Sequence, residues 1–332
     1  MPDVDRIRGY LASKAPYIEE VARRNVSFME AKFPANGRVV YQAVRASTLR
    51  EPGSFSATIP WIIADLCGVR PEDCVEVASS WECILLYARQ LDCITDKHTL
   101  SVDDKRQILA ASTLLVHGID LLGRLTRRQD EMHLESLYES AKFQRADIDS
   151  AFSGMATRPD DITAYLEVMT GKNLFVGVLF DYYLERSDIE SQHLNTFVRS
   201  LAAFAQIIDD VKDIDEDIAN ATYSHLMGAV QTAKDDTCSV LITLVANGSL
   251  ARSLDVALGF LRCATTVVSA RESKCYVSTQ QIQLANLSIY LEGLYCQVEE
   301  LLDYLNEHID AGDIAFVEPL IRDKIIRLWM GT

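Results

Sequence analysis

Apolar residues in this chain recur at intervals of three and four residues, as on one face of an α-helix, and not in the two-residue alternation of a half-buried strand. No proline occurs between Pro159 and Pro319. Within that stretch one such helical face is formed by Leu166, Met169, Leu174, Val178 and Tyr182. The pattern predicts an all-α fold.

Turn-forming residues divide the chain into segments of helix length. Prolines at positions 16, 34, 52, 60 and 71 punctuate its first part. The predicted breaks are Asn36-Gly37, Glu51–Gly53, Gly68–Glu72, Arg158-Pro159, Asn220–Ser224 and Asn247-Gly248. The chain shows no long polar linker, internal repeat or low-complexity segment, so we expect one helical bundle domain over residues 1–332.

Two acidic clusters stand at the ends of apolar runs. The first, Asp92–Asp96, follows the apolar residues 81–91, and the second, Asp209–Asp217, follows residues 197–208. The simplest arrangement is a bundle in which these two helices face each other, because bundles commonly build their sites from facing helices.

Within each cluster, carboxylates lie one helical turn apart. Asp92 and Asp96 have this spacing, and Asp209, Asp213 and Asp217 repeat it. Like charges at this spacing destabilise a helix unless a cation neutralises them. Mg²⁺ takes one or two carboxylates, keeps several waters and is completed by substrate phosphate oxygens. The alternative is that both clusters are solvated acidic ends of surface helices.

Mostly small or apolar residues precede both clusters by one to three turns. They are Trp81, Leu85 and Ala88 before the first cluster, and Ala202, Ala205 and Gln206 before the second. They predict an apolar cavity roofed by carboxylates, which fits an elongated apolar ligand with a diphosphate head. Candidate aromatic rings for facing a carbocation are Tyr87, Phe175, Phe180 and Phe204. The same residues could instead pack the core of a bundle.

Three cations are candidates for binding diphosphate oxygens: Arg89, Lys172 and Lys212. Lys172 lies in the apolar stretch of residues 165–180, where a lysine is costly unless it is paired. Its partner is either the diphosphate or one of the aspartates.

The composition narrows the class of partner. With 32 basic and 48 acidic residues the formal net charge is −16, which argues against nucleic acid or an anionic membrane as the main partner. The apolar run Val240–Ala246 is too short to span a bilayer, so no transmembrane segment is expected. The eight cysteines form no CxxC pair, and the first ten residues lack a signal-type apolar core. We expect a cytoplasmic protein.

Three stretches resemble one family. They are Glu82–Asp96, Tyr165–Asn173 and Gln206–Asp213, and their order and intervals are similar to those of trans-isoprenyl diphosphate synthases and related class I terpene synthases. The resemblance implies an α-bundle that binds several Mg²⁺ ions between two aspartate-rich helices and ionises an allylic isoprenyl diphosphate. It makes Asp92, Asp96, Asp209, Asp210, Asp213 and Asp217 metal ligands, Lys172 a diphosphate contact, and Gln206 the glutamine before the second cluster. A homodimer is left open.

The chain also departs from the family pattern. Cys93 stands where the elongating enzymes carry a second aspartate, and no Arg-Arg pair follows Asp96. Where the family has a Gly-Lys-x-x-Arg segment that binds isopentenyl diphosphate, this chain has Gly53–Ala57. These departures favour a class I terpene synthase that uses one allylic diphosphate and releases a terpene, expected to be cyclic, and diphosphate.

Two alternatives remain open. An elongating prenyltransferase could rebuild the second site with Arg45, Arg50 or Lys97. A non-catalytic regulatory subunit could have lost one metal aspartate at Cys93, although retention of the second cluster argues against it.

Overall fold

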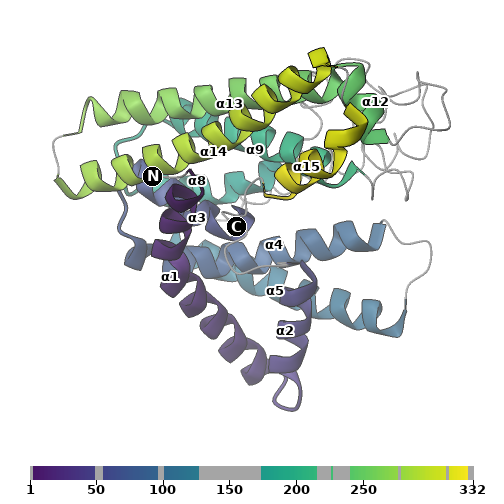
Figure 1. Cartoon of the computed structure of the whole chain (residues 1–332). Helices are drawn as coiled ribbons and strands as arrows, with labels where there is room; N and C mark the ends of the chain where they lie inside the picture. The colour runs from purple at the N-terminus through teal and green to yellow at the C-terminus, as the bar shows by residue number, and fades with distance from the viewer. Residues whose placement is uncertain are drawn as a thin grey trace.

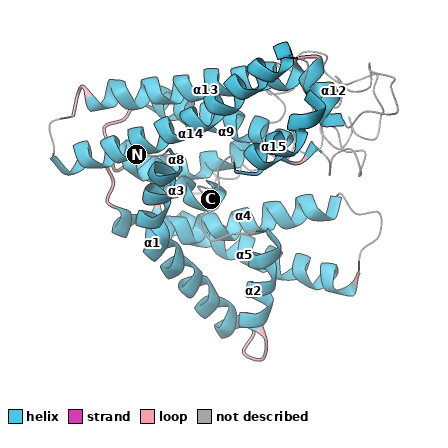
Figure 2. Ribbon diagram, viewed as in Figure 1, coloured by secondary structure: helices cyan, strands magenta, loops and turns pink. Residues whose placement is uncertain are grey.

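The computed structural model describes residues 3–48, 55–95, 101–126, 173–214, 226, 240–275, 278–311 and 314–327. All regular elements in these ranges are helical, as Figure 2 shows, so the all-α prediction is confirmed. The α-helices are α1 (Asp3–Lys32), α2 (Gly37–Thr48), α3 (Phe55–Cys67), α4 (Val75–Thr95), α5 (Val102–Leu125), α8 (Phe180–Leu184), α9 (Ser191–Lys212), α12 (Val240–Ala246), α13 (Ser249–Glu272), α14 (Ser278–Ala311) and α15 (Ile314–Arg327). Two 3₁₀ helices are η1 (Pro71–Cys74) and η3 (Asn173–Leu179).

Glycines mark the predicted breaks that the structure describes. A Cβ atom on Gly37 would lie 2.2 Å from the carbonyl oxygen of Met29, so only glycine fits the tight turn between α1 and α2. Gly68 follows α3 with a φ of 72°, and Gly248 precedes α13 with a φ of 71°. The breaks at residues 36–37, 68–72 and 247–248 are confirmed, whereas those at 51–53, 158–159 and 220–224 lie outside the described residues.

Three prolines of the described residues lie inside helices. They are Pro16 in α1, Pro60 in α3 and Pro319 in α15. A proline in a helix interior loses one backbone hydrogen bond, and packing has to compensate for it. Pro60 leaves the Ser56 carbonyl oxygen, four residues earlier, without its helical donor, and the Trp81 ring N–H of α4 donates to that oxygen across 2.8 Å.

Helices α4 and α5 pack closely because one side chain is missing between them. The Ser80 hydroxyl of α4 donates to the carbonyl oxygen of Gly118 on α5 across 2.6 Å. A Cβ atom on Gly118 would lie 2.8 Å from the Ser80 carbonyl oxygen. Glycine at this position therefore sets the distance between the two helices.

Figure 1 shows α9, α13, α14 and α15 in the upper part of the molecule and α4 and α5 below them, while α1 runs down past α4 to the turn into α2. α1 and α3 both pack on α14, and α9 packs on α13. A buried ion pair lies where α1 and α3 meet, with Lys14 Nζ 2.6 Å from Asp65 Oδ2. The Tyr10 hydroxyl also donates to Asp65, across 2.8 Å. Burial raises the pKa of Asp65, and the adjacent Lys14 ammonium opposes that shift.

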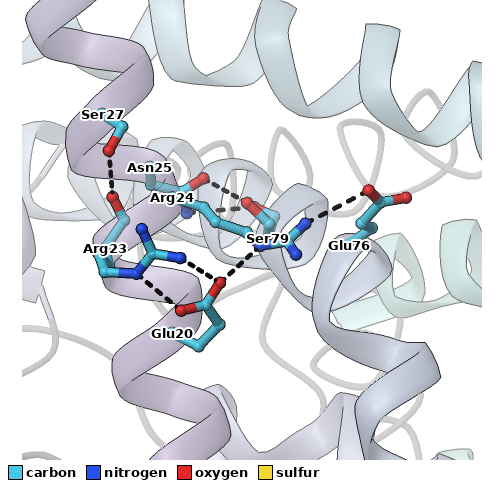
Figure 3. Close-up of polar contacts among 7 residues, drawn as sticks. All are labelled: Glu20, Arg23, Arg24, Asn25, Ser27, Glu76 and Ser79. Carbon is cyan, nitrogen blue, oxygen red and sulfur yellow. Dashed lines mark hydrogen bonds and ion pairs between the residues drawn. The ribbon is translucent and has the colours of Figure 1, made fainter.

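Polar contacts also hold α4 on α1, as Figure 3 shows. The Ser79 hydroxyl donates to the side-chain carbonyl of Asn25 across 2.5 Å, and both side chains are buried. Nearer the surface, Arg24 bridges Glu20 of α1 and Glu76 of α4 at 2.9 and 3.3 Å. The first acidic helix is thereby fixed at its N-terminal half, away from its aspartates.

Two helices in the described part of the chain, α5 and α13, are long and apolar enough to cross a membrane by length and composition alone. Core helices of water-soluble proteins pass the same test, so this observation shows no membrane span. α13 packs against both α9 and α14, and α5 packs on α4.

Candidate functional site

The second acidic cluster forms the C-terminal end of α9. Its buried face includes Leu194, Phe197, Leu201, Phe204, Ile208 and Val211. The cap residue is Asp213, whose backbone N–H donates to the Asp209 carbonyl oxygen across 2.9 Å. Packing of the apolar face on α13 thus fixes where the aspartates emerge.

The three described aspartates of this cluster differ in burial. Asp210 is buried at 5% exposure, Asp209 is half-buried, and Asp213 is exposed. The side-chain amide of Gln206 donates to Asp210 Oδ1 across 2.8 Å, and Lys212 is half-buried in the same turn. The carboxylates therefore extend from the packed interior to the surface.

The electrostatics of this helix end favour a cation. The C-terminus of a helix carries a partial negative charge, to which the carboxylates of Asp209, Asp210 and Asp213 add. One basic residue, Lys212, lies in the last turn. Oxygen ligands of this type suit Mg²⁺, so the donor chemistry fits the predicted metal. The described side chains alone form no group of three or more metal-binding residues close enough to hold an ion.

The other predicted ligands are only partly covered by the structure. Asp92 lies in the last turn of α4, but its side chain is not described. Asp96, Lys172 and Asp217 lie outside the described residues. The metal and diphosphate roles of these residues stay predictions.

The residues expected to line a substrate cavity differ in burial. Trp81 and Leu85 of α4 are fully buried, and the Trp81 ring N–H donates to the Ser56 carbonyl oxygen across 2.8 Å. This contact favours the alternative in which Trp81 packs the core. The half-buried residues are Tyr87, Ala88, Arg89, Phe180, Ala202, Ala205 and Gln206, whereas Phe204 is buried. Phe175 lies in η3, and its side chain is not described.

The two acidic helices have different packing partners. α4 packs mainly on α5, α1 and α2, whereas α9 packs mainly on α13 and also meets α8 and α15. A cavity of about 210 Å³ lies between α1 and α14, lined in part by Gly9, Tyr10 and Ile289. None of these lining residues was predicted to bind substrate. The face-to-face arrangement of α4 and α9, and the apolar cavity between their aspartates, stay predictions.

A buried carboxylate of α4, that of Glu82, lies in one of the stretches that resemble the family, but the resemblance assigns it no role. Glu82 accepts hydrogen bonds from the Tyr41 hydroxyl and from the Asn25 amide, the latter at 3.4 Å. Its other oxygen lies 3.4 Å from Arg45 Nε, and the Glu82 side chain is only 5% exposed. The sequence signal for this cluster is a single glutamate within the mostly apolar run of residues 77–86. A charge buried there requires partners, so the pattern predicts a paired glutamate.

The Glu82 contacts bear on the second substrate site. Arg45 was a candidate for binding isopentenyl diphosphate, and the structure pairs it with a carboxylate of its own chain. Burial and the neighbouring Glu82 carboxylate raise the pKa of Tyr41, so this phenol remains a hydrogen-bond donor. The other two candidates, Arg50 and Lys97, lie outside the described residues.

Comparison with known proteins identifies the fold. No protein-family model matches the chain, and no curated protein matches it. Among solved structures, the geranylgeranyl pyrophosphate synthetase of Pyrococcus horikoshii Ot3 has a TM-score of 0.62 at 18% identity, covering 86% of this chain and 98% of that one.

Two further structures agree. Polyprenyl synthase of Caulobacter crescentus CB15, solved with calcium and isoprenyl diphosphate, has a TM-score of 0.61 at 14% identity, with 87% and 97% of the two chains covered. Geranylgeranyl pyrophosphate synthetase of the archaeon Geoglobus acetivorans has a TM-score of 0.56 at 17% identity, with 82% and 98% covered. The chain therefore has the all-α fold of the isoprenyl diphosphate synthases, which confirms the predicted resemblance at the level of the fold.

Proposed function

We propose that this protein is an enzyme that ionises an allylic isoprenyl diphosphate with the help of Mg²⁺. The observation that carries the proposal is the carboxylate-rich C-terminal end of α9, in a fold shared with isoprenyl diphosphate synthases. One of those structures was solved with calcium and isoprenyl diphosphate. A divalent cation bound together with the diphosphate would neutralise the acidic end of α9.

Each residue has a role in this proposal. Asp209 and Asp213, with Asp92 and Asp96 of the first cluster, would hold the metal ions, which act as Lewis acids on the leaving diphosphate. Gln206 orients Asp210 through its hydrogen bond. Lys172 would meet the diphosphate oxygens, since a charge-assisted hydrogen bond is short and directional.

Of the possible outcomes for the ionised substrate, we propose transfer to isopentenyl diphosphate, that is, chain elongation. The neighbours in fold that we compared are polyprenyl and geranylgeranyl diphosphate synthases, which supports the prenyltransferase alternative better than the terpene synthase. A cytoplasmic location is part of the same proposal, because the cysteines mostly sit inside helical patterns, as reduced core residues do, and Cys67, Cys74 and Cys83 are free and buried.

A terpene synthase is the second candidate, and one observation favours it. The segment Gly53–Ala57 offers no lysine or arginine, and Arg45 is paired with the buried Glu82. A second diphosphate needs basic groups to bind in a chain with a net charge of −16.

One experiment separates these functions. The purified protein is incubated with allylic diphosphates of increasing chain length and Mg²⁺, with and without isopentenyl diphosphate, and products and free diphosphate are quantified. Chain-lengthened diphosphates support the prenyltransferase. A hydrocarbon or alcohol with isopentenyl diphosphate left unconsumed supports the terpene synthase. If neither kind of product forms with any substrate, and EDTA does not change the amount of free diphosphate, the enzyme proposal is wrong. The regulatory-subunit alternative then gains support.

A further inference from the structure

We propose that Asn247 is a site of spontaneous deamidation, a covalent modification that is separate from the catalytic proposal. Asn247 and Gly248 link α12 to α13, and the Asn247 side chain is exposed. In an asparagine–glycine pair, the backbone nitrogen of the glycine can attack the side-chain carbonyl carbon of the asparagine, because glycine has no Cβ atom to hinder the approach. Holding the two reacting groups in one short turn makes the attack intramolecular.

The reaction needs only water and hydroxide. A bond forms between the Gly248 nitrogen and the Asn247 side-chain carbon, and the bond from that carbon to the amide nitrogen breaks. The Gly248 nitrogen gives its proton to hydroxide, and the leaving amide nitrogen takes a proton from water and departs as ammonia. A five-membered succinimide remains, and water opens it to aspartate or isoaspartate.

The first contact that favours this reaction lies on the carbonyl group under attack. The backbone N–H of Ser249, the first residue of α13, donates to Asn247 Oδ1 across 2.9 Å. Negative charge develops on this oxygen as the nitrogen attacks, and a backbone N–H that is already aimed at it stabilises that charge. The N-terminal end of the helix adds a partial positive charge at the same place. The start of α13 therefore lowers the barrier to attack.

The second contact lies on the peptide group that supplies the attacking nitrogen. Arg252 Nη1 donates to the backbone carbonyl oxygen of Asn247 across 3.2 Å. That oxygen and the Gly248 nitrogen belong to the same peptide group, so the guanidinium charge favours loss of the Gly248 proton. The Gly248 N–H also donates to the Val245 carbonyl oxygen across 3.0 Å, and this bond has to break in the reaction.

The chain contains a second asparagine–glycine pair, which serves as an internal comparison. Asn36 is exposed like Asn247, but Gly37 is buried, and a Cβ atom there would lie 2.2 Å from the Met29 carbonyl oxygen. The Gly37 N–H donates to the Phe33 carbonyl oxygen across 2.7 Å, a shorter bond than that of Gly248. The nitrogen of Gly37 is therefore more confined, and we expect Asn36 to react more slowly.

The modification changes the start of a helix that supports the candidate site. Deamidation replaces a neutral amide with a carboxylate, so each modified chain carries one more negative charge. In the isoaspartate product the main chain runs through the former side chain, which lengthens the turn before α13. α13 packs on α9, the helix that carries the second acidic cluster.

The first test follows both pairs in the folded full chain at mildly alkaline pH. Samples are taken over time and digested with pepsin at low pH, which stops further deamidation, and mass spectrometry quantifies the two peptides. We expect Asn247 to convert roughly tenfold faster than Asn36 or more, the order of effect of one aimed donor. Chain unfolded in urea is the positive control, in which both pairs should convert at similar rates. Asn247→Gln, whose longer side chain cannot form the five-membered ring, should remove most of the acidic species seen by ion exchange.

The second test removes the cation that acts on the peptide group. Arg252→Met should slow the conversion of Asn247 several-fold with an unchanged thermal unfolding midpoint. Arg262→Met is the matched control, because Arg262 is also exposed on α13 but bonds to the Tyr295 hydroxyl. A merely structural role for Arg252 would give the opposite sign, since loosening the turn frees the Gly248 nitrogen and speeds the reaction.

The proposal is overturned if Asn36 converts as fast as Asn247 in the folded chain. It is also overturned if Asn247 stays intact in the folded chain over the time in which the urea-unfolded chain converts. An unchanged or faster conversion in Arg252→Met would show that the contacts around this turn do not promote the reaction, and would overturn it as well.

Discussion

The side-chain amide of Gln206 donates a hydrogen bond to the carboxylate of Asp210 across 2.8 Å, one turn further along α9. Asp210 is buried, whereas its neighbour Asp209 is half-buried at the same helix end. The glutamine thus orients the most buried carboxylate of the cluster. Groups that orient carboxylates around a metal contribute to its affinity without touching it.

We predict that Gln206→Leu lowers metal affinity and turnover together by roughly 10–100-fold, the usual cost of losing such an orienting group. Mg²⁺ titrations of diphosphate release measure both. Gln281→Leu, on the exposed side of α14, is the control and should leave the titration unchanged. A fall in turnover at saturating metal with unaltered Mg²⁺ affinity would contradict the orienting role.

Asp209→Ala should lose more activity than Gln206→Leu, that is, by more than roughly 100-fold, because it removes a predicted metal ligand. The metal-free protein should be at least as stable as wild type, since a like charge is removed from the negative end of a helix. Diphosphate release and thermal unfolding in EDTA are the two measurements. The exposed Asp255 of α13 provides the control, Asp255→Ala. Wild-type turnover in Asp209→Ala would refute the metal role.

The buried pair of Lys14 and Asp65 predicts a large loss of stability when one partner is removed. Lys14→Met leaves the Asp65 carboxylate buried without its cation, which should cost about 3–5 kcal/mol in the free energy of unfolding. Lys14→Met/Asp65→Asn should recover most of that loss, because the amide remains neutral and can still accept from the Tyr10 hydroxyl.

Urea denaturation measures both variants of this pair. The control is Arg23→Met, which breaks the surface ion pair of Arg23 with Glu20, drawn in Figure 3, and should change stability little. Equal destabilisation by Lys14→Met and Arg23→Met would show that burial of the pair has no special consequence.

A fourth prediction concerns pH. His117 stacks on Phe28 with ring centroids 3.5 Å apart, and burial lowers its pKa from the ordinary 6.5. Between the lowered folded pKa and 6.5 the unfolded chain binds more protons than the folded one, so the free energy of unfolding rises with pH across that window and falls on acidification through it. His117→Phe keeps an aromatic ring but removes the titration, so the slope of unfolding free energy against pH should become shallower there. An identical slope in both proteins would exclude this residue as the cause.

The features that could be predicted from the sequence are those that depend on the chemistry of neighbouring residues. Two such features depend only on residues close in sequence. Helix-end electrostatics govern the carboxylates at the end of α9, and backbone freedom governs the glycines at 37, 68 and 248. The all-α fold and the family resemblance could be predicted for the same reason, since helical periodicity and motif spacing are properties of neighbouring positions.

Contacts between distant segments were decided only by the tertiary structure. Where α3 continues through Pro60, the Trp81 ring N–H donates to the Ser56 carbonyl oxygen that the proline leaves without a helical donor. Arg45 is paired with Glu82, which lies 37 residues away in sequence. Such pairings depend on which helix faces which, and hydrophobic periodicity specifies a buried face without naming its partner. The sequence by itself thus determined the helices and the acidic helix ends that indicate the candidate site. Packing between helices decided which charges are already paired inside the protein.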